Sequence, residues 1–181
     1  MEAQRIHSPR SPIGKGNSSP HNQPLMKKAM SWGIHHLDCE SYALRCLSFV
    51  EDCLEKGGGI LVPKGTSAKQ MAALYRVAPR EEIPPPGVFV FYDSFGPIQG
   101  MRKNWGHVGL SLGEGDVIHA WDRVRIDHYL EIEKLPVGDG WSQPVYLGWV
   151  PVDLSSQARD AWPDPLKSVP RQIGSTCSFW E

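Results

Sequence analysis

Three side chains in the sequence have the chemistry to cleave an amide bond: the thiol of Cys46 and the imidazoles of His107 and His119. A cysteine attacks a carbonyl carbon as its thiolate, and a neighbouring imidazole can take the thiol proton and later return it to the leaving group. The start of a helix favours the thiolate, because free backbone N–H groups and the helix dipole stabilise negative charge. Cys46 falls in the first turn of a predicted helix, and we therefore expect it to be an activated nucleophile.

The two histidines lie on either side of a turn at Gly113-Glu114-Gly115. If the loop has three residues, Gly109 lies opposite His119 and Trp121 lies opposite His107. Both imidazoles then share one face of a hairpin as diagonal neighbours, roughly 7–8 Å apart at the backbone. A two-residue loop would place them on opposite faces. The glycine at each end of the turn permits the three-residue loop, so we expect the two rings to meet.

The elements that must position these side chains follow from the hydrophobic pattern. An apolar stripe runs along the helix that contains Cys46, and Gly57-Gly58-Gly59 ends that helix. The predicted helices cover residues 25–36, 43–56 and 67–76. The predicted strands cover residues 88–92, 106–112, 116–121, 124–127 and 145–150. Helices first and strands afterwards indicate an α+β fold with an antiparallel sheet.

Length and composition suggest one globular domain with a tail at each end. Residues 1–24 and 155–181 are rich in polar and helix-breaking residues, which predicts disordered tails around a domain at residues 25–154. The net charge of −1 gives no electrostatic reason to expect nucleic acid or an anionic membrane as a partner. No apolar run approaches the ~18 residues of a membrane span. We expect a monomer that uses neither a metal nor another cofactor.

The four cysteines, Cys39, Cys46, Cys53 and Cys177, bear on the compartment. The N-terminus lacks the apolar segment of a secretory signal peptide, so we expect free thiols rather than a disulfide framework. Free thiols indicate a reducing compartment. The expected location is the cytoplasm, with export by a non-standard route left open.

Three segments, within about residues 40–127, resemble those of the NlpC/P60 family. The first runs from Cys46-Leu47-Ser48-Phe49-Val50 to Gly57-Gly58-Gly59 and resembles the family's nucleophile helix, in which a cysteine begins a helix that ends in glycine. The second, Pro86-Gly87-Val88-Phe89-Val90-Phe91, resembles a core strand of the family. The third, residues 106–120, resembles the family's histidine hairpin almost position by position.

This resemblance implies a papain-like fold in which the nucleophile helix packs on a central antiparallel sheet. It implies Cys46 as nucleophile, His107 as general base and acid, and His119 as the polar residue that orients His107. The backbone N–H of Cys46 belongs to the implied oxyanion site. The implied reaction is attack on an amide carbonyl, formation of a thioester acyl-enzyme and its hydrolysis. The usual substrates are peptides of the bacterial cell wall.

Two other functions stay open on the same scaffold. One is an amidase or acyltransferase that acts on a lipid or a protein, and the other is a domain that binds a ligand without catalysis. The sequence departs from the family pattern around the nucleophile, where Arg45-Cys46-Leu47-Ser48 replaces the usual Asp-Cys-Ser-Gly, and at Gly87, where an Asp is common. Neither a wall-binding repeat nor a signal peptide accompanies the domain, which bears on the substrate more than on the mechanism.

Other residues are candidates for parts of the site. Asp38-Cys39 resembles the family's Asp-Cys dipeptide, but the apolar residues and glycines fall at the family's spacing only from Cys46. Asp122 is an alternative to His119 as the group that orients the base. Trp105 and Trp121 flank the histidines and are candidates to line a substrate groove.

Three further features are interpreted as structural. His35, His36 and Cys39 lack a clear fourth ligand for zinc, so no metal site is expected there. Cys53 lies on the buried stripe of its helix. The charged stretch at residues 127–134 is interpreted as the solvated face of a helix.

Overall fold

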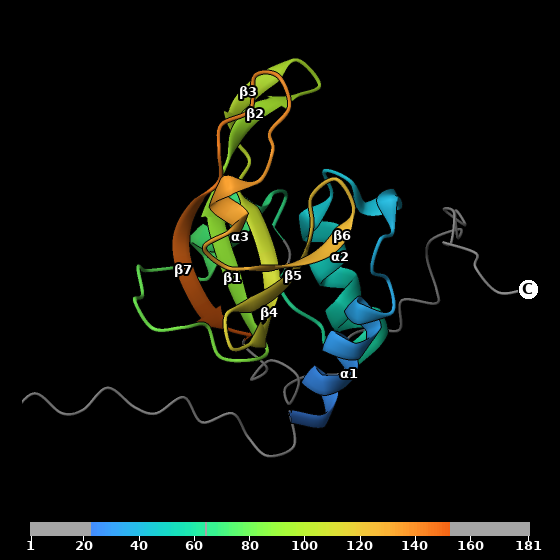
Figure 1. Cartoon of the computed structure of the whole chain (residues 1–181). Coiled ribbons are helices and arrows are strands. Elements are labelled where there is room, and N and C mark those ends of the chain that lie inside the picture. The colour runs from blue at the N-terminus through green and yellow to red at the C-terminus, as the bar shows by residue number, and fades with distance from the viewer. Residues whose placement is uncertain (1–22, 64, 153–181) are drawn as a thin grey trace, which may run out of the picture.

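A five-stranded antiparallel sheet forms the centre of the described part of the chain, which in this computed structural model comprises residues 23–63 and 65–152 (Figure 1). Its strands are β1 (Val88–Asp93), β4 (His107–Gly113), β5 (Asp116–Ala120), β6 (Val124–His128) and β7 (Val145–Pro151). They lie in the order β6-β5-β4-β1-β7, and every neighbouring pair is antiparallel. The predicted α+β fold is confirmed.

Helices precede the sheet in the chain. They are α1 (Gln23–Ile34), the 3-10 turn η1 (Glu40–Tyr42), α2 (Cys46–Asp52) with its π-helical continuation η2 (Cys53–Gly57), and α3 (Ala68–Leu74). α2 begins at Cys46 rather than at residue 43, so Cys46 is its first helical residue. The hydroxyl of Ser67 caps α3 by accepting a hydrogen bond from the backbone N–H of Gln70 at 3.2 Å.

The side chains of β1 alternate between two apolar clusters. Phe89 and Phe91 belong to the larger cluster, which packs the helices against the sheet. Val90 and Tyr92 belong to a smaller cluster that includes Ile132 of the 3-10 turn η3 (Ile132–Lys134). Burial on both faces explains why β1 has a continuous apolar sequence instead of an alternating one.

The turn between β4 and β5 differs from the predicted three-residue loop, yet it gives the predicted register. The loop is Glu114-Gly115, and both residues have positive φ (54° and 93°). A register shift between Ser111 and Gly113 adds one residue to β4 and restores the pairing of Gly109 with His119. The bulge compensates for the shorter loop, so the two histidines share one face of the sheet.

A second sheet was absent from the sequence-based prediction. Strands β2 (Phe95–Ile98) and β3 (Met101–Asn104) form a hairpin that projects beyond the main sheet (Figure 1). Little of this hairpin is buried, so its sequence carries no apolar alternation that could reveal it.

The ends of the domain can be compared with the prediction only in part. α1 begins at Gln23, two residues before the predicted helix. The rest of the predicted N-terminal tail and the predicted C-terminal tail lie outside the described residues. Within the described residues, none of the helices has the length and hydropathy of a membrane span.

Cys46 and Cys53 are free thiols in the structure. Cys39 is disulfide-bonded, so the expectation of free thiols is wrong for this residue and no longer supports a reducing compartment. Local sequence could not reveal this, because disulfide formation depends on which residues the folded chain brings together. Cys177 lies outside the described residues.

Candidate active site

Cys46 lies where α2 packs against β4 and β5. The residue as a whole is half-buried, while its sulfur is shielded from water. The backbone N–H groups of Val108, of Leu47 and of Cys46 itself lie close enough to the sulfur to favour its negative charge. Because Val108 follows His107 directly in β4, the packing of α2 brings the predicted nucleophile into the neighbourhood of the predicted base.

Burial dominates the electrostatics of the Cys46 thiol. Removal from water raises its pKa to about 11, although the backbone N–H groups of Val108, Leu47 and Cys46 lower it in part. The prediction that the helix start activates this thiol is therefore wrong for the resting site. The backbone N–H groups at the start of α2 lower the pKa of the thiol less than burial raises it. At neutral pH the side chain is a neutral thiol.

His107 begins β4 and is 2% exposed. Three rings surround its imidazole, with centroids 4.9 Å (His119), 5.1 Å (Trp121) and 5.8 Å (Tyr92) away. Its Nε2 forms a hydrogen bond of 2.9 Å with Nδ1 of His119. The other ring nitrogen, Nδ1, has no hydrogen-bond partner within the described residues. It is therefore the nitrogen that can act on a thiol or a substrate.

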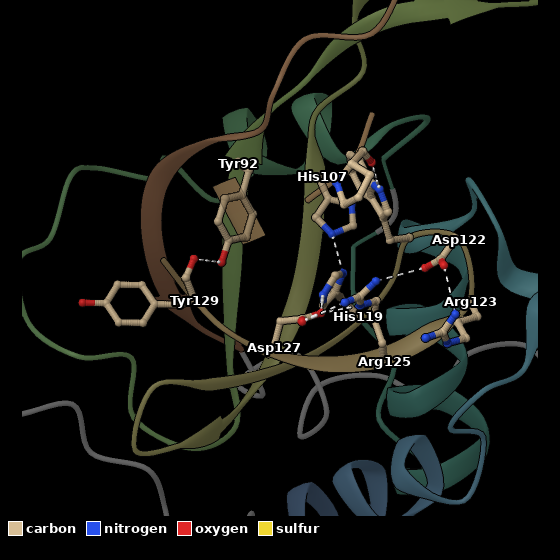
Figure 2. A network of polar contacts seen from close by, with 10 residues as sticks. Tyr92, His107, His119, Asp122, Arg123, Arg125, Asp127 and Tyr129 are labelled. Atoms are coloured by element: carbon tan, nitrogen blue, oxygen red, sulfur yellow. Dashed lines mark hydrogen bonds and ion pairs between the residues drawn. The ribbon is translucent and has the colours of Figure 1, made fainter. Parts of the chain in front are cut away.

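A chain of polar contacts continues from His119 to β6 (Figure 2). Nε2 of His119 lies 3.0 Å from Oδ2 of Asp127. Arg125 donates to both oxygens of the same carboxylate, from Nε to Oδ2 at 2.5 Å and from Nη2 to Oδ1 at 3.0 Å. Asp127 was expected on an exposed helix face, and this is wrong: it lies on β6 with 15% of its side chain exposed.

The charge state of this chain follows from burial and pairing. Burial lowers the pKa of His107 well below 6.5, and the neighbouring His119 lowers it further. Burial also lowers the pKa of His119, although the hydrogen bond to Asp127 opposes that shift. Burial alone would raise the pKa of Asp127, but the hydrogen bonds from His119 and Arg125 outweigh it and hold this pKa at about 2. At neutral pH both imidazoles are neutral and Asp127 is a carboxylate.

A cavity of about 590 Å³ is lined by both Cys46 and His107. The structure places Trp105 and Trp121 in its wall, together with Trp141. Hydrogen bonds hold in place both tryptophans that were predicted from the sequence. Trp105 donates its indole N–H to the carbonyl of Gly96 at 2.9 Å, and Trp121 donates its indole N–H to the carbonyl of Pro136 at 2.8 Å. The volume is that of a site for a small molecule or a few residues of a peptide.

One polar group in the cavity wall stands out. Ser94 is 1% exposed, and its hydroxyl has no hydrogen-bond partner within the described residues. Its backbone is fixed, because its carbonyl accepts from the N–H of Trp105 at 2.9 Å and its N–H donates to Asn104 at 3.1 Å. Buried hydroxyl groups are normally paired, and this one is an exception among the described residues.

Asp122, the alternative orienting residue, forms its hydrogen bonds with Arg123 and Arg125 instead of with a histidine. Sequence reasoning missed Asp127, although a signal was present. Arg125 pairs with His119 across β5 and β6, so Asp127, two residues further on, is a diagonal neighbour of His119. Extending the register by one strand would have identified it.

The zinc candidates stand apart from the cavity lining. His35 and His36 donate hydrogen bonds to the carbonyls of Ser31 and Trp32 in the last turn of α1. In the part of the chain that the structure describes, no group of three or more His, Cys, Asp or Glu side chains is arranged to hold a metal ion.

Comparison with known proteins gives a family match. The sequence model of the NlpC/P60 family matches residues 27–141. Curated proteins show no significant match. Among solved structures, the fold is similar to that of RipD from Mycobacterium tuberculosis, described as a non-catalytic NlpC/p60 domain protein adapted to peptidoglycan binding. That similarity has 18% identity and a TM-score of 0.41 and covers 70% of this chain and 97% of RipD, which is too low for the properties of RipD to bear on this site.

Proposed function

Because the chain belongs to the NlpC/P60 family, we propose that it is a thiol hydrolase that cleaves an amide bond in peptides of the bacterial cell wall. The observation that supports this most directly is the single cavity lined by Cys46 and His107. Behind it, a ring nitrogen of His119 contacts His107, which is the His–His contact that the proposed Cys-His-His arrangement requires.

The proposed reaction has two stages. Nδ1 of His107 takes the thiol proton while the sulfur of Cys46 attacks the amide carbonyl carbon, and the backbone N–H of Cys46 stabilises the oxygen as it becomes negative. His107 then returns the proton to the leaving amine, the C–N bond breaks and a thioester remains on Cys46. Water, deprotonated by His107, then attacks the thioester carbon. The C–S bond breaks, the acyl part leaves as a carboxylic acid, and His107 returns its proton to the sulfur, which restores the thiol.

The resting charge states of Cys46 and His107 indicate when the proton is transferred relative to the attack on the carbonyl. Burial raises the pKa of the Cys46 thiol and lowers that of His107, so neither group is charged before substrate binds. Within the described residues no hydrogen bond links the two side chains. Proton transfer therefore accompanies the attack on the carbonyl instead of preceding it, and the alignment is completed when substrate fills the cavity.

The cavity wall indicates how a peptide is held. Trp105, Trp121 and Trp141 offer apolar faces to the side chains that flank the scissile bond. The unpaired hydroxyl of Ser94 supplies a hydrogen bond to a polar group of the substrate. A peptide has both kinds of group within a few residues.

Binding without turnover is the second candidate. The observation that favours it is the state of Cys46, whose pKa is raised to about 11 and which has no hydrogen bond to His107 among the described residues. A domain of this kind would hold the same peptides in the same cavity and release them unchanged.

Mass spectrometry of the products formed from a panel of defined cell-wall peptides and simple amides tests the two candidates. The wild-type chain is expected to cleave a peptide from the panel, and Cys46→Ala is expected to bind that peptide without cleaving it. Cys53→Ala is the matched control, because Cys53 is the other free thiol among the described residues and is 0% exposed in the core. Binding of peptide by the wild type with no product would establish the second candidate, and products from Cys46→Ala would contradict the first.

A further inference from the structure

We infer that Asp127 is a positioning residue, which acts through His119 to fix the ring nitrogen of His107 that is free to accept a proton. The inference rests on the proposed role of His107 as general base. It adds a fourth member to the Cys-His-His arrangement, one that does not touch substrate. The contacts that support it are drawn in Figure 2.

Asp127 determines which ring nitrogen of His119 carries the hydrogen. Oδ2 of Asp127 lies 3.0 Å from Nε2 of His119, and the same carboxylate accepts two hydrogen bonds from the guanidinium of Arg125. Arginine is always charged, so the paired carboxylate stays ionised and can only accept. Nε2 of His119 therefore carries the hydrogen.

The tautomer of His119 in turn determines the tautomer of His107. A neutral imidazole with its hydrogen on Nε2 has a lone pair on Nδ1. Nδ1 of His119 therefore accepts, and Nε2 of His107, 2.9 Å away, must donate. Since His107 is also neutral, its Nδ1 has the lone pair. This is the nitrogen without a partner among the described residues and the one required to take the thiol proton.

The opposite arrangement is disfavoured at both contacts. A hydrogen on Nδ1 of His119 would leave the bare Nε2 facing the carboxylate of Asp127, two acceptors in contact in a buried place. His107 would then carry its hydrogen on Nδ1 and could not act as a base. The Asp127–Arg125 pair thus determines the tautomer of His107, which it reaches only through His119.

Nitrogen-15 NMR of the full chain with labelled histidine tests this directly, because the two ring nitrogens differ in shift according to which one carries hydrogen. Signals are assigned by their loss in His107→Gln and His119→Gln. At neutral pH both residues are expected as the Nε2–H tautomer. Detection of the Nδ1–H tautomer as the main form of either residue would overturn the inference, whether or not the chain is active.

Asp127→Ala and Asp122→Ala form a matched pair, since each removes a carboxylate partner of Arg125 but only Asp127 contacts a histidine. Asp127→Ala is expected to lose the defined tautomer at both histidines. We expect kcat to fall by about tenfold to a hundredfold, by analogy with the outer partners of metal-binding histidines, with KM little changed. Asp122→Ala is expected to keep the wild-type histidine signals. Unchanged histidine signals in Asp127→Ala would contradict the inference. If that variant does not fold, the wild-type spectrum alone decides.

Discussion

Gly109 lies directly opposite His119 across β4 and β5, and a Cβ atom on Gly109 would lie 3.0 Å from the Cβ atom of His119. The same added atom would lie 2.4 Å from Cγ1 of Val117 and 3.0 Å from the backbone oxygen of Ile118. A side chain at position 109 therefore has no room unless β5 moves. The absence of a side chain there allows β5 to present His119 to His107.

Gly109→Ala is expected to lower both stability and activity. Overpacking of this kind destabilises a core by about 1–3 kcal/mol, and any shift of His119 loosens its hydrogen bond to His107. Urea unfolding and kcat/KM measure the two effects. Gly100→Ala is the control, because it is strained by a positive φ of 77° but meets no atom within 4 Å. Full activity in Gly109→Ala would show that His119 need not stay in place.

Loss of His107 is expected to lower the rate more than loss of His119. General base catalysis contributes about 10²–10⁴-fold, so His107→Ala should lower kcat within that range. His119→Ala leaves the base present but loosely held, and a smaller decrease is expected. Steady-state kinetics of both variants on one peptide gives the comparison. Equal losses, or a larger loss for His119→Ala, would mean that the two roles are exchanged.

Stability is expected to fall as pH decreases below about 6.5. Both buried histidines have a lower pKa in the folded chain than when unfolded, so the unfolded chain binds more protons in this range. Each contributes a decrease of about 1.4 kcal/mol per pH unit between the unfolded pKa of 6.5 and its own folded pKa. The pKa of Asp127 is held at about 2, so its contribution to stability is lost only as the pH falls below the ordinary carboxyl pKa of 3.8.

Urea unfolding at several pH values measures this dependence. His107→Gln removes one of the two buried imidazoles and should reduce the slope by about half. An unfolding free energy that is constant between about pH 7 and about pH 5 would mean that the histidines are not protected from protons in the folded chain.

Replacement of Ser94 should separate binding from stability. Ser94→Ala removes a hydroxyl that has no partner among the described residues, so the unfolding free energy should stay the same or rise. Loss of one hydrogen bond to substrate should raise KM by roughly 2- to 12-fold, which corresponds to about 0.5–1.5 kcal/mol. Ser111→Ala is the contrasting control. The hydroxyl of Ser111 is paired with Pro84 at 3.0 Å, so this change should destabilise the fold. An unchanged KM in Ser94→Ala would exclude Ser94 from the substrate site.

The helices, the five strands of the main sheet and the meeting of the two histidines could be predicted because they depend on local pattern and on counting along one hairpin. The bulge at Leu112 could not, because a bulge and a longer loop give the same register between His119 and Gly109. The hairpin β2–β3 could not be predicted, because little of it is buried and its sequence therefore lacks an apolar pattern.

The electrostatics of Cys46 could not be predicted from its position at a helix start. The helix start lowers a thiol pKa and burial raises it, and only the packed structure shows which effect is larger. Asp127, in contrast, could have been identified by extending the register from β5 to β6. It was missed because the charged residues around it suggested an exposed surface.

Mass analysis of the chain during turnover tests the account most directly. A cleavable cell-wall peptide is mixed with the wild-type chain, and the reaction is stopped with acid. The chain is then digested, and the mass of the fragment that contains Cys46 is measured by mass spectrometry. We expect this fragment to gain the mass of the acyl part of the peptide, through a thioester that hydroxylamine removes. The acylated fragment is not expected to accumulate in His107→Ala. Products formed with no acyl group on Cys46 at any time, or with the acyl group on Cys53 instead, would contradict it.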